Sequence, residues 1–208
     1  MSEYSLTYAG LVTPRAPALP AGERRLTLIE ATLPLLRVHG RAVTTRQIAD
    51  AAGVAEGTIF RVFTTKDELV DEAVIHAFRS ATFVKQLEQL EDGLPLRERL
   101  VAITRLLQDR YIASFELFRA MGTMGPPAAV KSDARHQDWR KHVDLAIAAR
   151  VEPDADQLRV PVERLVNTLR LLTLGGSNTH MSDGGLMSPE EIVDTVLVGL
   201  LADPRGSN

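Results

Sequence analysis

Residues 45–62 read TRQIADAAGVAEGTIFRV, and this stretch decides how the N-terminal part of the chain folds. Ile48 is placed to face inward from a first helix, and Ala49 is small where a second helix must cross closely. Gly53 follows and can take the left-handed conformation that a Cβ would penalise by about 1 kcal/mol. Ile59 then supplies an apolar side chain from the other side of the turn. The stretch therefore predicts a helix-turn-helix.

Helix signals continue on both sides of this motif. Apolar residues recur every three or four positions from Glu23 to Val38 and predict a helix before the motif. Thr44 with Gln47, and Thr65 with Glu68, have the spacing of capping boxes, so each pair predicts a helix start. The second of these helices is expected to be long, running from Lys66 into the region of Lys85.

The rest of the chain also has helical periodicity. Apolar spacing predicts one long helix from Leu96 to the glycines near residue 122, followed by helices near 133–149, 161–174 and 189–201. Residues 1–21 carry three prolines without sustained periodicity, so they predict a disordered arm. Only 5% of the residues are aromatic, which also favours helix packing. The predicted fold class is all-α.

Composition excludes several functional classes. The 208 residues contain no cysteine, which excludes thiolate metal sites and a cysteine nucleophile and agrees with a cytoplasmic location. No apolar run approaches the roughly 18 residues of a membrane span, so no membrane contact is expected. The sequence has no G-x-S-x-G, phosphate-binding glycine loop or metal-ligating cluster. We therefore expect no enzyme activity, no cofactor and no metal.

The helix-turn-helix and its flanks, from Arg25 to Leu69, resemble the DNA-binding domain of the TetR family of one-component transcriptional regulators. The residues that carry the resemblance are Arg25, Ile29, Ala31, Gly40, the run Thr44–Ala49, the run Ala51–Val54, the run Gly57–Phe60, Phe63, Lys66 and Leu69. Beyond this region the chain is similar to the family only in its helical pattern and length.

The resemblance implies a two-domain organisation. Residues 22–66 would form a three-helix DNA-binding domain, and a long helix would join it to an all-helical ligand-binding and dimerisation domain over residues 67–208. Homodimers would form through the helices near 161–174 and 189–201. The implied function is a repressor that leaves a palindromic operator in double-stranded DNA when a small, largely apolar effector binds. The alternative is an interaction adaptor of the same fold with weakened or lost DNA binding.

Base and phosphate contacts are also implied by the resemblance. Arg61 can bind guanine, Thr58 can contact a thymine methyl, and Glu56 can accept from cytosine. The alternative is that Glu56 only satisfies a helix N-terminus and that Arg61 is a solvated cation. The family usually has tyrosine at the position of Phe60 and often histidine at that of Val62, so two phosphate contacts are expected to be missing. The expected DNA-binding residues are Thr44, Thr45, Arg46, Ala55, Glu56, Thr58, Phe60, Arg61 and Lys66.

Large, soft side chains gather in the second half of the chain. Phe115, Phe118, Met121 and Trp139 are the candidate effector contacts, with Met124 nearby in the sequence. Ordinary core packing is the alternative role for each of them.

The net charge of −3 is unevenly distributed. Residues 22–66 carry seven basic and four acidic side chains, whereas the rest of the chain carries 17 basic and 23 acidic ones. A modestly basic DNA-binding region beside an acidic remainder is therefore compatible with binding to nucleic acid.

Overall fold

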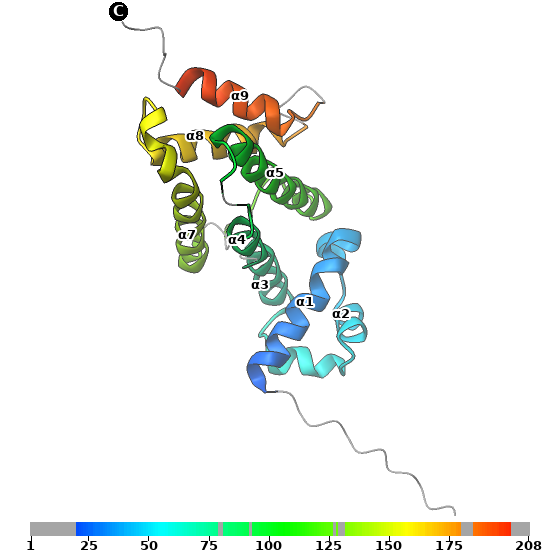
Figure 1. Ribbon diagram of the computed structural model, residues 1–208. Helices are drawn as coiled ribbons and strands as arrows, with labels where there is room; N and C mark the ends of the chain where they lie inside the picture. The colour runs from blue at the N-terminus through cyan, green and yellow to red at the C-terminus, as the bar shows by residue number, and fades with distance from the viewer. Residues whose placement is uncertain are drawn as a thin grey trace, which may run out of the picture.

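A computed structural model describes residues 20–78, 81–91, 93–126, 128, 132–179 and 185–200. Within these residues all regular secondary structure is helical, as the sequence predicted (Figure 1). None of the helices in this part of the chain is both long and apolar enough to cross a membrane. Residues 1–19 of the predicted arm lie outside the described residues. The α-helices are α1 (Ala21–His39), α2 (Thr45–Ala52), α3 (Lys66–Phe78), α4 (Ala81–Glu88), α5 (Leu96–Ala120), α7 (Ala134–Val151), α8 (Val162–Gly176) and α9 (Pro189–Leu200), and the 3-10 helices are η1 (Gly40–Ala42), η2 (Glu56–Arg61) and η3 (Glu152–Gln157).

The helices pack around two hydrophobic cores. The N-terminal core joins α1, α2, η2 and α3 and includes Leu36, Ile48, Ile59 and Leu69, each with no exposed surface. The C-terminal core joins α4, α5, α7, α8 and α9, and its fully buried residues include Leu165. Burying a side chain of this size contributes about 1.5–3 kcal/mol, so each core is a substantial unit.

Helix α5 contributes to both cores. Leu100 and Leu107 lie in the C-terminal core, whereas Leu117 lies in the N-terminal core with Met121, which follows the helix. Figure 1 shows α5 among the C-terminal helices, with one end toward the N-terminal group. At that end Gly40 lies directly against the backbone of Ala120. The two halves of the molecule are therefore packed against each other through α5.

The local signals in the sequence mostly gave the correct helix ends. Thr44 and Gln47 form the predicted capping box at the start of α2. Ser188 likewise accepts from the backbone N–H of Glu191, while the Glu191 carboxylate accepts from the N–H of Ser188. At α3 only half of the predicted box is present, because Glu68 accepts from the N–H of Thr64, not from that of Thr65.

The long helix predicted from Lys66 to about Lys85 is divided in the structure. Helix α3 ends at Phe78, and α4 begins at Ala81. Arg110 of α5 donates to the carbonyl oxygen of Phe78. This side chain satisfies a carbonyl that a continuous helix would have paired with the backbone four residues later. The interruption therefore involves a residue 32 positions away in the sequence.

Replacing Gly40 with alanine is expected to destabilise the protein strongly. Gly40 has φ +54°, and an added Cβ would lie 2.1 Å from the carbonyl oxygen of Ala120. This oxygen belongs to the backbone, so it cannot move aside as the end of a side chain could. Strain and overpacking together predict a loss of about 3 kcal/mol of unfolding free energy, measured by urea denaturation. Gly53→Ala is the matched control, because Gly53 has φ +65° with open space around it and should lose only about 1 kcal/mol. Equal losses in the two variants would contradict the proposed close packing at Gly40.

Candidate nucleic-acid interface

The turn between α2 and η2 has the geometry that the sequence predicted. Gly53 adopts the left-handed conformation with φ 65° and ψ 33°. The N–H of Val54 donates to the carbonyl oxygen of Ala49 at 3.0 Å, which closes the end of α2. Ile48 and Ala49 are the buried residues of α2, and they share the N-terminal core with Ile59 of η2. Gly53 thus reverses the chain without strain, and the small Ala49 lets the two helices approach.

The second helix of the motif, η2, is a six-residue 3-10 helix. Such short helices have little stability of their own. Ile59 is fully buried, and its carbonyl oxygen accepts from the N–H of Phe63 at 2.8 Å. Phe63 is itself buried, with 1% of its surface exposed. Packing of these two side chains therefore fixes the orientation of η2.

Arg25 of α1 holds the C-terminal end of η2. Its guanidinium lies 4.2 Å from the centre of the Phe63 ring and donates to the carbonyl oxygen of Val62 at 3.3 Å. The same group forms ion pairs with Glu68 at 3.7 Å and Glu72 at 3.5 Å on α3. The sequence suggested Arg25 only as part of the family pattern, because its partners lie about 40 positions away. Arg25 thus links α1, η2 and α3.

A hydrogen bond joins the two helices of the motif on their exposed side. The hydroxyl of Thr45 donates to Oε1 of Glu56. This contact shows that Glu56 has a partner within the protein, which sequence reasoning did not predict. Any contact of Glu56 with a base would have to share or replace the Thr45 hydroxyl. Its predicted role at cytosine stays a prediction.

Several basic side chains near the motif are engaged by the protein itself. The Lys66 ammonium donates to the carbonyl oxygens of Arg41 and Val43, both at 3.1 Å. Arg41 forms ion pairs with Asp67 at 3.6 Å and Asp71 at 3.2 Å. These contacts support the turn that precedes α2, and they leave Lys66 fewer donors for phosphate.

Arg46 and Arg61 remain available for a ligand. Both are exposed, and neither forms a hydrogen bond or ion pair with any residue that the structure describes. Phe60 lies beside Arg61 in η2 and is 54% exposed. Ala55 and Thr44 are exposed, and Thr58 is half-buried. The motif therefore presents two exposed cations, which pair with no residue that the structure describes, beside an exposed aromatic ring.

Two of the candidate effector contacts, Phe118 and Trp139, are connected through the rings of Phe78 and His136. Phe118 is buried and stacks on Phe78 with ring centres 5.3 Å apart, and Met121 packs in the N-terminal core. Phe115 is half-buried, and Trp139 lies beside Arg110. Met124 is 98% exposed. The role of these residues in effector binding stays a prediction.

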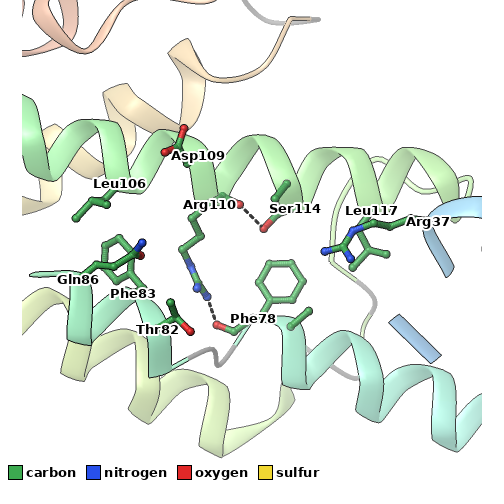
Figure 2. A pocket seen from close by; sticks show the side chains of 12 residues that line it. Arg37, Phe78, Thr82, Phe83, Gln86, Leu106, Asp109, Arg110, Ser114 and Leu117 are labelled. Atoms are coloured by element: carbon green, nitrogen blue, oxygen red, sulfur yellow. Dashed lines mark hydrogen bonds between the residues drawn. The ribbon is translucent and has the colours of Figure 1, made fainter. Parts of the chain in front are cut away.

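A cavity of about 240 Å³ lies between α1, α3, α4 and α5 (Figure 2). None of the candidate effector contacts lines it. Its lining residues are Arg37, Ala77, Phe78, Thr82, Phe83, Gln86, Leu106, Asp109, Arg110, Ala113, Ser114 and Leu117. One signal for it was visible in the sequence: Arg110 has no acidic residue three or four positions away on its helix. In the described part of the chain, no three histidine or acidic side chains are placed to hold a metal ion.

Comparison with known sequences identifies the N-terminal part of the chain. Residues 28–73 match the family described as bacterial regulatory proteins, tetR family. Residues 28–73 therefore belong to the TetR family. The match covers the helix-turn-helix and most of α3, so the N-terminal part is a TetR-family DNA-binding domain. TetR-family proteins are regulators, which supports the expectation that the chain is not an enzyme.

Two named relatives that match part of the chain are repressors. It is 37% identical over 81 residues to the HTH-type transcriptional repressor KstR2 of Rhodococcus jostii, covering 38% of this chain and 39% of the relative. It is 33% identical over 94 residues to KstR2 of Mycobacterium tuberculosis, covering 45% and 43% of the two chains. The chain thus spans about two fifths of the length of the curated relatives it matches.

Solved structures extend the likeness in fold to most of the chain. A putative TetR-family regulator from Mesorhizobium loti has a TM-score of 0.65 at 14% identity, covering 89% of this chain and all of that one. A TetR regulator from Haloarcula marismortui has a TM-score of 0.63 at 18% identity, covering 87% of this chain and all of that one. The arrangement of a helix-turn-helix domain with further helices is therefore that of the TetR fold.

Arg61→Ala is expected to weaken binding to a specific duplex by tenfold to a hundredfold. The substitution removes an exposed cation with no partner among the described residues, so folding should not change. Loss of one good base contact costs about 1–3 kcal/mol of binding free energy. Loss of a phosphate contact reduces the slope of the logarithm of the binding constant against the logarithm of the salt concentration by about one. Fluorescence anisotropy at several salt concentrations measures both effects. Arg140→Ala, at an exposed position of α7, is the control, and an equal loss in both variants would argue against this interface.

Proposed function

We propose that this chain is a DNA-binding transcriptional repressor that acts as a homodimer on an inverted repeat and is released by a small-molecule effector. The observation that carries the proposal is that Arg46 and Arg61 are exposed on a TetR-family helix-turn-helix and have no partner in the described part of the chain. A major groove about 12 Å wide admits one helix, and the protein side chains at its surface then reach the base edges. The repressor names of the matched relatives support the direction of regulation.

In this proposal the predicted DNA contacts fall into two groups. The first group would contact base edges and consists of Arg46, Ala55, Thr58 and Arg61. Glu56 would join this group if its carboxylate accepted from cytosine in place of the Thr45 hydroxyl. Thr44, Thr45 and Lys66 would lie at the margins, where contacts to the phosphate backbone are made, and Phe60 would lie beside them without a donor for phosphate. Lys66 would act mainly by supporting the turn before α2, since it already donates to two carbonyl oxygens.

The proposed homodimer forms through α8 and α9. Leu171 on α8 is 53% exposed, and Val198 on α9 is 80% exposed, although both helices also contribute to the C-terminal core. Exposed apolar side chains on two adjacent helices are suited to packing against a second copy. Dimerisation would place two helix-turn-helix motifs about one turn of DNA apart, which an inverted repeat requires.

The proposed division of labour places DNA binding in residues 22–66 and effector binding with dimerisation in residues 67–208. The two activities are coupled if DNA and effector favour different positions of the two motifs, with a typical coupling free energy of 1–3 kcal/mol. Helix α3 is suited to connect them, because it packs in the N-terminal core and its end lies at the cavity.

Selection from random duplexes tests DNA recognition. We expect the purified full chain to enrich one inverted repeat at modest salt, because two symmetry-related motifs read the two halves. Sequencing of the bound pool measures the enrichment, and the Arg61→Ala protein is the control. A bound pool without any repeated half-site would contradict the proposal.

Charged residues on the proposed dimer surface should separate the two copies. A variant with Leu171→Glu and Val198→Glu is expected to sediment as a monomer while retaining its helical circular dichroism, since both side chains already face water in one copy. Its affinity for a single half-site should be unchanged, but its affinity for the full repeat should fall at least tenfold. Leu145→Glu on α7, a residue that is 67% exposed, is the control. A double variant that stays dimeric would place the interface elsewhere.

A second candidate function is an interaction adaptor, which the exposed Phe60 favours. An aromatic side chain that is 54% exposed is suited to a protein partner as well as to DNA. The salt dependence separates the two functions, because specific DNA binding weakens steeply with salt and depends on Arg61. Equal duplex binding by the wild-type and Arg61→Ala proteins would favour the adaptor.

A further inference from the structure

The cavity lies at the junction of the two cores. Leu117 belongs to the N-terminal core and Phe83 to the C-terminal core, and both line it. Its volume of about 240 Å³ is slightly below the range of roughly 300–1,000 Å³ usual for drug-sized ligands. A small molecule bound here would therefore contact both halves of the protein at once.

Arg110 provides a cation in this cavity that has no acidic partner among the described residues. The side chain is half-buried, and it forms no ion pair with the residues that the structure describes. Its guanidinium donates to the carbonyl oxygen of Phe78 and lies 4.0 Å from the centre of the Trp139 ring and 5.7 Å from that of Phe83. Burial lowers its pKa to about 10, so it stays charged at neutral pH. A carbonyl and two ring faces compensate the charge only in part.

The one acidic residue that lines the cavity does not neutralise Arg110. Asp109 is exposed, and Figure 2 shows its carboxylate on the opposite side of α5 from the Arg110 guanidinium. Arg37 of α1 adds a second, exposed cation at the edge of the cavity. The cations therefore favour an anion in this space, and a carboxylate can accept two parallel N–H bonds from one guanidinium.

The remaining walls define the rest of the ligand. Phe78, Phe83, Leu106 and Leu117 are apolar, whereas Thr82 and Gln86 of α4 are polar, and the hydroxyl of Ser114 donates to the carbonyl oxygen of Arg110. The apolar side chains are suited to a short hydrocarbon body, and the polar ones can line the path of its acid group. The space and its lining thus fit a small molecule with one carboxylate and an apolar chain.

We propose that this junction cavity binds a small amphipathic carboxylate, whose acid group pairs with Arg110 and whose chain lies against Phe78 and Phe83. The regulatory part of the inference rests on the proposed function. Arg110 also holds the last carbonyl of α3, a helix of the N-terminal core, so pairing with the ligand alters a link between α5 and the DNA-binding half. Bound carboxylate consequently weakens DNA binding, and bound DNA weakens carboxylate binding by the same factor.

Trp139 is the only tryptophan, and its ring faces the Arg110 guanidinium, so its fluorescence reports on this site. The full-length protein is titrated with hexanoate, octanoate and decanoate, and with the alcohols of the same chain lengths. We expect a saturable change in Trp139 emission and at least tenfold tighter binding of octanoate than of octanol. Arg110→Gln should abolish the preference for the acid, whereas Arg119→Gln, at an exposed position of the same helix, should retain it.

Arg110→Lys is a second variant that tests the site if Arg110→Gln does not fold. It keeps the charge but loses the planar fork, so a reduced preference for octanoate over octanol is expected. Thermal unfolding checks that each variant is native. Equal affinities for acid and alcohol in the wild-type protein, or an unchanged acid preference in folded Arg110→Gln, would overturn the proposed site.

Duplex binding separates this inference from the proposed function. If the selected duplex binds and octanoate reduces its affinity through Arg110, both are supported. If the duplex binds but no carboxylate does, the site is wrong and the repressor function stands. If octanoate binds through Arg110 but no duplex is selected, the site stands and the proposed function fails. Octanoate binding through Arg110 without any effect on duplex affinity would overturn the regulatory link.

Discussion

Burial of Ile59 and Phe63 in the N-terminal core is the constraint on which the proposed interface depends. A six-residue 3-10 helix cannot hold an orientation alone, so η2 takes its direction from the side chains it buries. Arg25 strengthens this arrangement by stacking on Phe63 and donating to Val62. Because the buried face is fixed, the opposite face presents Arg61 and Phe60 in a defined position. The exposed chemistry of the motif is thus a consequence of its packing.

The same packing decides which basic residues remain for a ligand. The sequence gives residues 22–66 an excess of basic side chains. In the structure, acidic side chains of α3 pair with Arg25 and Arg41, and backbone oxygens engage Lys66. The local excess of positive charge therefore does not measure the charge available to DNA. On the surface of the helix-turn-helix itself, Arg46 and Arg61 are the exposed cations that have no partner among the described residues.

Sequence reasoning succeeded where the deciding interaction is local. The capping box at Thr44 and the left-handed turn at Gly53 involve residues a few positions apart, and both are present. It was less successful where the partner is distant. The hydrogen bond from Arg110 of α5 to the last carbonyl of α3, and that from Thr45 to Glu56, cannot be predicted from periodicity. The junction cavity was missed for the same reason, since it exists only where helices from both halves meet.

Helix α5 has a mechanical consequence because of its length. Its 25 residues span about 37 Å at a rise of about 1.5 Å per residue. One part is fixed among the C-terminal helices, and its last turn lies against Gly40 with no side chain between the two backbones. A rotation of α5 by about 5° around its first turn would move its far end by about 3 Å, by the geometry of a rod of this length. Because no side chain separates the two backbones, a displacement of this end of α5 would have to move Gly40 and the turn before α2 with it.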